Sequence, residues 1–440
     1  MKKIILLLAF ITLVAVQQAS AQSGITWSAA MDVATGSFDN NYPRMALDGN
    51  GNPLVLWGNY STSNALFSRW SGSSFTAPVA LNTASVPVYV TNWTGPDIAS
   101  KGDTVYAVFK KIPYGTNPSY VVRSFDGGMN FSSPVQVDYI SDSISWLPTI
   151  GTDAGGNPFV AYMKLDSGFI DSRWVVAKSA DFGNTFLTDV KASGYSGATE
   201  VCDCCPGTIV SSATKTAMLY RDNLSNVRDI WTGISNDNGN SFPSGINVDQ
   251  NNWAIFACPA SGPDGVIVDD TLYSVFMSGV SGKNLVYSNK NSLSAPVSSS
   301  ANLITGNFTG LTQQNYPRIA NYNSAVAIVW KQATSSSSQL SLFFTANIHN
   351  GFPAAFDTVA IGNLNAVANT DVAVFNGSIH IVWQDNVSGT VKYRKGTFSP
   401  SSVFSNNSSN YSDVLIYPNP TNGLFNITSD DPDSYRERIT

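Results

Sequence analysis

The feature that most constrains this chain is a short pattern that recurs about every 55 residues. Three segments read S-x-D-x-G-x-x-F and begin at Ser124, Ser179 and Ser235. Weaker copies of the same pattern begin at Ser68, Ser288, Thr345 and Tyr393. Self-similarity at a fixed period indicates an array of equal supersecondary units, each of which must stack on its neighbours to bury its apolar face.

Two other series give the same number of units. An aromatic residue ends an apolar run once per unit, at Trp57, Phe109, Tyr162, Tyr220, Phe276, Trp330 and Trp383. A proline starts a strand once per unit, at Pro43, Pro96, Pro148, Pro206, Pro259 and Pro317, with Thr370 in its place in the seventh. Four short strands per unit are typical of a propeller blade. The sequence therefore predicts an all-β chain that forms a seven-bladed β-propeller over residues 25–405, or a six-bladed one if a degenerate copy is not a blade.

The segment "ITWSAAMDV", Ile25 to Val33, stands before the first unit and resembles the last strand of a unit, such as "FTAPVALN". We expect it to pair in the final blade. Pairing there closes the ring and leaves no open sheet edge between the first and last blades.

The S-x-D-x-G-x-x-F pattern resembles the Asp-box of sialidase-like (BNR-repeat) propellers. In such a turn the Asp side chain accepts backbone hydrogen bonds, the glycine takes a positive φ, and the aromatic side chain fills the blade core. The resemblance implies the fold of the sialidase superfamily and places the motif away from the ligand-binding face. Sialidases proper have six blades, so a seventh departs from that family.

The N-terminus reads as a secretory signal peptide over residues 1–21. Lys2 and Lys3 precede an apolar run, and "ASA" at residues 19–21 is a small-residue cleavage site. The apolar run is too short to cross a membrane, and no later run is long enough. The sequence thus predicts an exported protein without a membrane span in its mature form.

The C-terminal region differs from the repeats. A polar Ser/Asn stretch runs from residue 398, and its part at 406–413 reads as a linker. The next segment, "VLIYPNPTNGLFNI" from Val414, resembles the start of the C-terminal sorting domain of Bacteroidetes type nine secretion cargo. The resemblance implies that residues 414–440 are a truncated copy of a small β-sandwich, that the secretion machinery is a partner, and that the protein is secreted or held at the outer cell surface.

Charge excludes one class of partner. Only 12% of the residues are charged and the net charge is −6. Because no basic patch is present, the sequence predicts no binding to nucleic acid.

The four cysteines lie in two places: Cys202, Cys204 and Cys205 in "EVCDCCPG", and Cys258 in "ACPASGP". An even number in an exported chain favours two disulfides, with Cys205 or Cys202 joined to Cys258 and the other pair closing the loop. A bond between the adjacent Cys204 and Cys205 would strain the peptide between them. The alternatives are a Zn(II) or Cu(I) site with up to four thiolates, and a redox-active dithiol; otherwise no cofactor is expected.

Each Pro-centred strand start opens on the channel face, where propellers bind ligands. Cys205 and Cys258 precede a proline in adjacent blades, so we expect them at equivalent positions. On the other side of the channel mouth the residues after the proline or threonine form an alternating arc of charge, Arg318, Asp371, Arg44 and Asp97. We interpret this arc either as a structural ring whose charged side chains pair with one another, or as a site in which guanidinium groups bind a sugar carboxylate.

A sialidase-type mechanism needs an arginine triad, a Tyr nucleophile with a Glu, and an Asp acid. The candidates are Arg44, Arg318 and Arg221 for the triad, Tyr42 or Tyr316 with Glu200 for the nucleophile, and Asp97 or Asp371 for the acid. The family's F/Y-R-I-P motif is missing, because "YPRMA" and "YPRIA" place these residue types in another order. Trp93 and Trp146 precede strand starts and are candidate platforms for stacking a sugar.

These observations predict a secreted or cell-surface propeller that interacts with a glycan, without establishing catalysis. The first alternative is an exo-glycosidase of sialidase type that releases terminal sialic acid. The second is a structural, adhesive or metal-binding surface protein that uses the cysteine cluster. An arginine triad that faces a Tyr–Glu pair would distinguish the first alternative from the rest.

Overall fold

The computed structural model describes residues 24–34, 38–138, 143–304, 309–352 and 354–399, and two short strands at 415–417 and 426–428. The chain divides into two compact units, Met1–Pro400 and Ser401–Thr440. The signal peptide predicted at residues 1–21 and the linker at 406–413 lie outside the described residues. Nowhere in the described part does a helix reach the length and hydrophobicity needed to span a bilayer.

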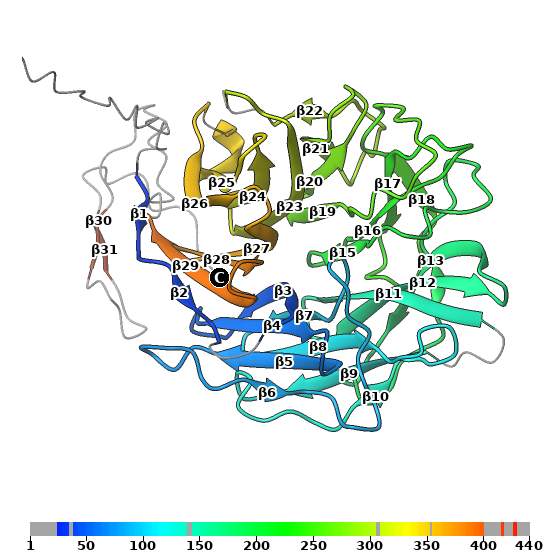
Figure 1. The fold of residues 1–440 in the computed structure, drawn as a ribbon, viewed down its shortest axis with the longest axis horizontal. Helices are drawn as coiled ribbons and strands as arrows, with labels where there is room; N and C mark the ends of the chain where they lie inside the picture. The colour runs from blue at the N-terminus through cyan, green and yellow to red at the C-terminus, as the bar shows by residue number, and fades with distance from the viewer. Residues whose placement is uncertain are drawn as a thin grey trace, which may run out of the picture. The chain divides into compact units, whose positions relative to one another are not determined.

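The first unit is a ring of seven antiparallel sheets, as predicted, and the innermost strand of every sheet faces the middle of the ring (Figure 1). The strands of blades one to three are β3 (Asn40–Leu47), β4 (Pro53–Asn59), β5 (Asn64–Arg69) and β6 (Val79–Ala80); β7 (Asp97–Lys101), β8 (Thr104–Lys110), β9 (Ser119–Ser124) and β10 (Val135–Gln136); and β11 (Ser143–Thr152), β12 (Pro158–Asp166), β13 (Ile170–Lys178) and β14 (Val190–Lys191).

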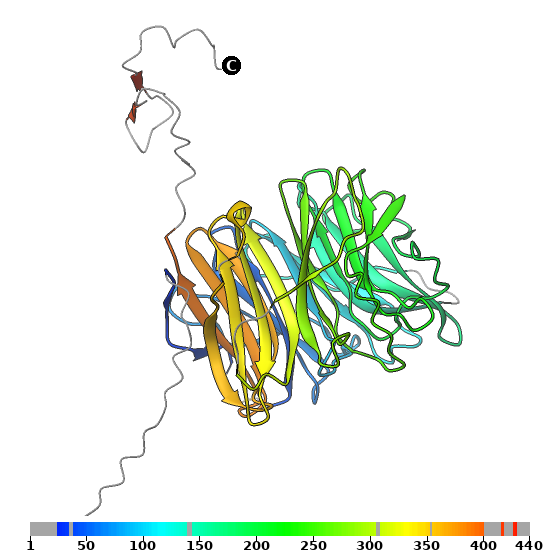
Figure 2. The same ribbon diagram turned by 90° about the horizontal axis from the view of Figure 1, so that it is seen from above.

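The remaining blades follow the same order, and a side view shows their sheets standing next to one another around the ring (Figure 2). Their strands are β15 (Thr208–Ser211), β16 (Thr216–Arg221), β17 (Ile230–Ser235) and β18 (Ser244–Asn247); β19 (Asp264–Val268), β20 (Thr271–Ser278), β21 (Leu285–Ser292) and β22 (Asn302–Leu303); β23 (Gln313–Tyr322), β24 (Ala325–Ala333), β25 (Ser337–Thr345) and β26 (Asp357–Asn363); and β27 (Val367–Phe375), β28 (Ser378–Asp385) and β29 (Thr390–Thr397). A single 3-10 turn, η1 (Ile348–Asn350), follows β25.

The N-terminal segment supplies the outer strand of blade seven. Two short strands, β1 (Thr26–Trp27) and β2 (Met31–Asp32), both pair antiparallel with β29. The amides of Ser28 and Val33 also donate to carbonyls of the last blade, at 2.8 and 2.9 Å. The predicted closure of the ring is confirmed, and it covers an edge of β29 that would otherwise be open.

The second unit contains one described hairpin. Strand β30 (Leu415–Tyr417) pairs antiparallel with β31 (Asn426–Thr428), so that Ile416 faces Ile427. These strands lie within the segment that resembles a sorting domain, and that identity remains a prediction.

The apolar core lies between the blades. Each pair of neighbouring blades encloses one cluster of buried apolar side chains in the described part of the chain. Each cluster contains one residue of the aromatic series found in the sequence, and that residue lies on the second strand of its blade. Trp57, Phe109 and Trp330 of this series have no exposed surface. Burial of large side chains on both faces of each sheet explains why the repeats need one another.

The S-x-D-x-G-x-x-F segments form the turns between the third and fourth strands. In the turn of blade three, Ser179 Oγ donates to Asp181 at 2.8 Å and accepts from the amide of Gly183, which has a φ of 77°. The amide and hydroxyl of Thr185 also donate to the Asp181 carboxylate, and these bonds lower the pKa of Asp181 to about 2. Phe186, at the end of the motif, is buried in the cluster between blades two and three. The motif is therefore a structural turn that anchors one blade on the preceding one.

Candidate functional site

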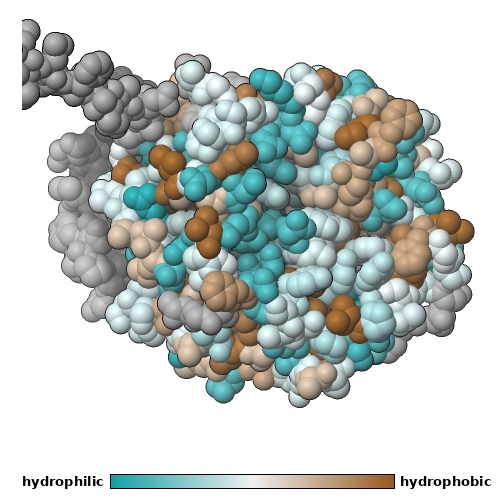
Figure 3. Space-filling model, in the orientation of Figure 1, coloured by the Kyte–Doolittle hydropathy of each residue, from teal (hydrophilic) through white to brown (hydrophobic). Residues whose placement is uncertain are grey.

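A cavity of about 50 Å³ opens where the inner strands begin. Inner-strand residues of six blades line it, together with residues of the loops that precede blades two, four and five, among them Trp93, Pro206 and Ala260. Figure 3 shows hydrophilic residues gathered around the middle of the ring. We call this region the channel mouth.

One side chain per blade forms a polar ring at the same level. The residues that pair with the fourth or fifth residue of the second strand define this position, because each occupies the same place in the ladder. They are Arg44, Asp97, Thr149, Thr208, Asp264, Arg318 and Asp371. In blades one, two, three, six and seven the ring residue is the one that follows the predicted proline or threonine. In blades four and five it is Thr208 and Asp264, which lie two and five residues after the predicted Pro206 and Pro259.

The error in blade five changes the position of the cysteines. The proline that starts its inner strand is Pro263, not Pro259, so Cys258 lies six residues before the ring position and Cys205 only three. The expected equivalence of Cys205 and Cys258 is therefore wrong. The sequence held a signal for the correct register, because "GPDG" at residues 262–265 repeats "GPDI" at residues 95–98.

Three aspartates of the ring share one structural task. Asp97 Oδ2 accepts from the amide of Ile150 at 3.3 Å and from the hydroxyl of Thr149 at 2.7 Å. The other two aspartates do the same toward the next blade: Asp264 accepts from the amide of Ile319 at 2.9 Å, and Asp371 from the amide of Met45 at 2.8 Å. Each carboxylate therefore ties one inner strand to the next one around the ring.

The charge of Arg318 is also balanced within the polar ring. Arg318 Nε lies 3.0 Å from Asp371 Oδ1 and 3.3 Å from Asp264 Oδ2. Burial raises the pKa of Asp264 to about 6, against the opposing effect of the Arg318 charge. Arg318 is thus held by two carboxylates from its neighbouring blades.

Arg221 does not join Arg44 and Arg318 in a triad. It ends β16, is fully buried, and donates to the carbonyls of Ser261, Arg228 and Met277 at 2.7 to 3.3 Å. Its guanidinium also lies 5.3 Å from the ring centre of Trp253. These partners occupy its donors, and Arg221 does not line the cavity.

Arg44 has a different environment. It lines the cavity and is only 6% exposed, yet in the described part of the chain no salt bridge joins it to a carboxylate. Its guanidinium lies 3.6 Å from the ring centre of Tyr42, and Nη1 donates to the Pro43 carbonyl at 2.8 Å. A buried cation with one carbonyl and one ring as partners has unused N–H donors, and here it belongs to a residue that lines the cavity.

A backbone bulge places several cavity residues. The ladder between the first and second strands shifts register just before the ring position in blades one, three, six and seven. The residues at these shifts have positive φ values: Tyr42 (56°), Leu147 (50°), Tyr316 (53°) and Asn369 (41°). All of them line the cavity. A positive φ is unfavourable for residues other than glycine, and here it recurs at the equivalent position of four blades.

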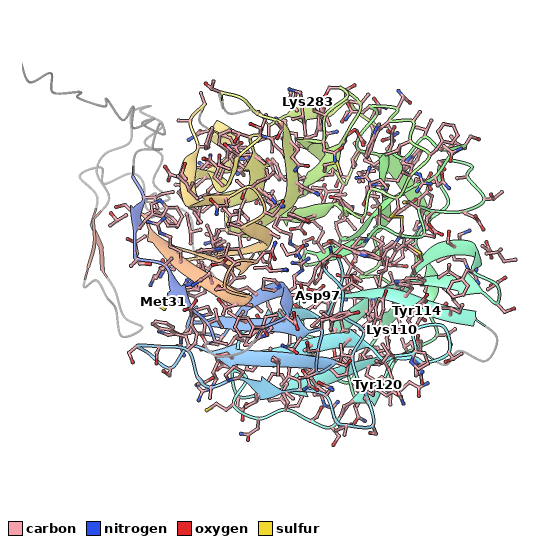
Figure 4. All side chains as sticks on the ribbon, in the orientation of Figure 1. Met31, Asp97, Lys110, Tyr114, Tyr120 and Lys283 are labelled. Atoms are coloured by element: carbon pink, nitrogen blue, oxygen red, sulfur yellow. A yellow bond between two sulfur atoms is a disulfide. The ribbon has the colours of Figure 1, made fainter. Side chains whose placement is uncertain are left out.

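Aromatic side chains continue outward from the mouth. Tyr114 packs on Tyr89 and Trp146 with ring centres 5.1 and 4.4 Å apart, and Phe169 lies 6.0 Å from Trp146. We call these four residues the aromatic platform. Trp146 precedes the cavity residue Leu147, so the platform begins at the rim. Figure 4 shows Asp97 near the middle of the ring and Tyr114 farther out.

The predicted platform residues Trp93 and Trp146 are both half-buried and on this face, whereas Tyr89, Tyr114 and Phe169 were missed. Tyr89 lies in the loop before blade two, and Tyr114 and Phe169 lie in hairpins between second and third strands. Phe169 is 46% exposed. The hairpins of different blades meet only in the folded ring, so no local pattern marks these residues.

The loop before blade two also reaches over the mouth. The carbonyl of Asn92 accepts from Asn369 Nδ2 of blade seven at 2.6 Å. Trp93, the next residue, lines the cavity. This bond holds the loop against the mouth and narrows the entrance.

Glu200 is not at the cavity. Its carboxylate accepts from the amide of Asp171 at 2.6 Å and so supports the hairpin that carries Phe169. Of the predicted nucleophile pairs, the structure brings Tyr42 and Tyr316 to the cavity but does not bring Glu200 to either. A Tyr–Glu pair is therefore not assembled by these residues.

The four cysteines form one cluster between the loops that precede blades four and five. Cys204 and Cys258 form a disulfide with their Cα atoms 6.1 Å apart. Cys202 and Cys205 are buried thiols. The predicted bridge between the two loops is present, but through Cys204, and the predictions for Cys202 or Cys205 with Cys258 are wrong. With two sulfurs in a bridge, a site of four thiolates is not formed.

The pKa values of the two free thiols are shifted in opposite directions. Their Sγ atoms lie 3.3 Å apart, and Arg228 Nη1 donates to Cys202 Sγ at 3.0 Å. The hydrogen bond with Cys205, together with the charges of Arg221 and Arg228, lowers the pKa of Cys202 to about 6. Burial raises the pKa of Cys205 well above its usual range. Cys202 is thus the more acidic thiol of the pair.

Comparison of the sequence with known protein families and with characterised proteins finds no match. Solved structures do resemble the chain. An ulvan lyase, described as a polysaccharide lyase, matches at a TM-score of 0.50 and 10% identity over 81% of this chain and 94% of its own. A protein of unknown function from Dyadobacter fermentans matches at 0.46 and 11% over 86% of this chain and all of its own.

A mutant sialidase from Trypanosoma rangeli matches at a TM-score of 0.47 and 12% identity, over 86% of this chain and 59% of its own. At these identities the likenesses show the fold alone. The fold is thus shared with a polysaccharide lyase, and the activity of this chain must be argued from its own residues.

Proposed function

We propose that the channel mouth binds the anionic group of a glycan, with the rest of the glycan lying across the aromatic platform. The observation that carries this proposal is Arg44, a buried guanidinium that lines the cavity without a carboxylate partner. Burying a cation without an opposite charge is costly, and a ligand carboxylate or sulfate removes that cost. A planar guanidinium matches either group through paired hydrogen bonds.

The size of the cavity supports a binding mode in which only part of the ligand enters it. A volume of about 50 Å³ is small compared with the roughly 150 Å³ that holds a benzene ring. An acidic substituent fits such a space, whereas a sugar ring does not. The ring itself therefore stays outside, where Trp93 and the platform offer aromatic faces for stacking.

Binding without hydrolysis is the form of this function that the residues support. The cavity is lined by two tyrosines, Tyr42 and Tyr316, and by no glutamate, while Asp97 is engaged by Thr149 and the amide of Ile150. No residue there is placed as a free general acid beside a nucleophile. The second function considered, a sialidase-type hydrolase, lacks these parts.

We also propose that this binding takes place outside the cell. The support is the signal-like segment at residues 1–21 and the resemblance of residues 414–440 to a type nine sorting domain. The partners of the protein are then a surface or extracellular glycan and the secretion machinery.

The experiment is calorimetric titration with uronic-acid oligosaccharides and with neutral oligosaccharides of equal length. We expect the acidic series alone to bind, and Arg44→Met to weaken its binding by about ten-fold to a hundred-fold, as expected for a lost charge-assisted pair. Arg123→Met is the matched control, since Arg123 donates to Phe182 and Asn184 on exposed turns away from the mouth.

Equal binding of both series, or unchanged binding by Arg44→Met, would contradict the proposal. Turnover of a fluorogenic sialoside that disappears in Arg44→Met would contradict the conclusion that the site binds without hydrolysis. Arg44→Met and Arg123→Met both replace a side chain by one of similar volume, so loss of folding is not the expected result.

A further inference from the structure

The cysteine cluster holds a thiol pair against a disulfide. Cys202 Sγ lies 3.3 Å from Cys205 Sγ and 3.6 Å from Cys204 Sγ, so it touches both the other thiol and one sulfur of the bridge. Cys202 and Cys205 are at most 1% exposed, whereas Cys258, at the far end of the bridge, is exposed. The cluster thus extends from two buried thiols to an exposed cysteine.

We propose that this cluster is a thiol–disulfide exchange site, in which the buried Cys202–Cys205 dithiol is oxidised by a small disulfide that reacts at the surface through Cys258. The site is independent of the glycan proposal. It is separate from the channel cavity, because none of the four cysteines lines that cavity.

The first step is internal. The Cys202 thiolate attacks Cys204 Sγ, a Cys202–Cys204 bond forms, the Cys204–Cys258 bond breaks, and Cys258 leaves as a thiolate. Arg228, 3.0 Å from Cys202 Sγ, favours the thiolate that attacks. No external oxidant or reductant is needed, since one disulfide replaces another.

The second step moves the bridge inward. Cys205 attacks Cys202 Sγ, the Cys202–Cys204 bond breaks, and the proton of Cys205 passes to the departing Cys204 sulfur. The products are a buried Cys202–Cys205 disulfide, a thiol at Cys204 and a thiolate at Cys258. Cys202 and Cys205 have the Cys-x-x-Cys spacing of redox-active pairs, which allows a bond between them across a tight turn.

The last step involves the external disulfide. Cys258 attacks it and forms a mixed disulfide with release of one thiolate. Cys204 then attacks Cys258 Sγ, restores the Cys204–Cys258 bridge and releases the second thiolate. The balance is one buried dithiol oxidised and one external disulfide reduced to two thiols.

The test uses the folded full chain, purified with a chelator and without a reductant. The probe is a bis-nitrobenzoate disulfide, whose thiolate product is coloured. We expect about two equivalents of coloured thiolate from the wild type. Peptide mapping should then find the Cys204–Cys258 and Cys202–Cys205 bridges.

Single variants separate the steps. Cys205→Ser keeps the first step alone, so about one equivalent is expected, with the nitrobenzoate on Cys258 and a Cys202–Cys204 bridge. Cys202→Ser removes the attacking sulfur and should release almost none. The Cys204→Ser/Cys258→Ser double variant keeps the dithiol but removes the relay, so its reaction should be at least about ten-fold slower than that of the wild type.

Three results would overturn the proposal. The first is a double variant that folds, by circular dichroism, and reacts as fast as the wild type, because the probe then reaches the dithiol directly. The second is no release from the wild type. The third is stoichiometric zinc or copper in protein purified in parallel without a chelator, which would make the cluster a metal site.

Discussion

At the scale of the residue, Arg221, Arg318 and Arg44 differ in their hydrogen-bond and ion-pair partners. Those partners distinguish a structural arginine from one that can bind a ligand. The guanidinium of Arg221 donates to backbone carbonyls, and that of Arg318 pairs with two carboxylates. Arg44 keeps unused donors at the channel mouth. Sequence reasoning grouped all three as a triad, because residue type and strand position do not reveal which neighbours will occupy the guanidinium group.

A first prediction concerns Asp264. Its pKa is raised by burial from 3.8 to about 6. The folded state therefore holds this proton more tightly than the unfolded state does. The stabilising effect is complete below pH 4 and is lost as the pH rises to 6.

In Asp264→Asn that pH dependence is removed. The difference in unfolding free energy, wild type minus variant, should thus fall by up to about 3 kcal/mol between pH 4 and pH 6. Urea unfolding at a series of pH values measures it. A difference that stays constant, or rises with pH, would show that Arg318 sets the ionisation of Asp264 instead.

At the scale of the strand and the blade, the features that recur in every unit can be predicted from the sequence. The blade number, the closing strand and the buried aromatic series follow from periodic patterns, and the structure confirms them. The register of blades four and five does not follow, because a proline before a strand is common and "ACPASGP" contains two. The cysteine pairing failed for the same reason, since it was inferred from that register.

A second prediction concerns the S-x-D-x-G-x-x-F turns. Gly239 has a φ of 77°, and a Cβ there would lie 2.5 Å from the ring of the buried Phe159. Gly239→Ala should lower the free energy of unfolding by about 3 kcal/mol, from backbone strain and overpacking together.

Gly102→Ala is the matched control, since Gly102 also has a positive φ but open space around it. It should cost only about 1 kcal/mol. Equal losses in the two variants, measured by urea unfolding, would mean that the turn does not press against the neighbouring blade.

At the scale of the whole molecule, the ring is stabilised by contacts that join every blade to the next. Apolar clusters fill the spaces between blades, the ring aspartates bind amides of the following strand, and the N-terminal strands close the last gap. The mouth itself combines loops and strands from all seven blades and depends on this closure. The sequence could place its inner-strand residues but not its aromatic platform, which forms from hairpins distant in the chain.

A third prediction tests the closure. Removal of residues 24–34 should lower the thermal midpoint and promote aggregation, because β29 then exposes an unpaired edge. Scanning calorimetry and light scattering measure both effects. An unchanged midpoint would mean that the pairing of β1 and β2 with β29 adds nothing to the ring.

The central claim is that Arg44 receives an acidic group at the channel mouth. The most direct measurement is a crystal structure of the protein with a uronic-acid oligosaccharide. We predict density for the carboxylate within hydrogen-bond distance of the Arg44 guanidinium and for a sugar ring against Trp93 or the aromatic platform. Density for the sugar elsewhere on the ring, with the cavity filled by water alone, would contradict the account.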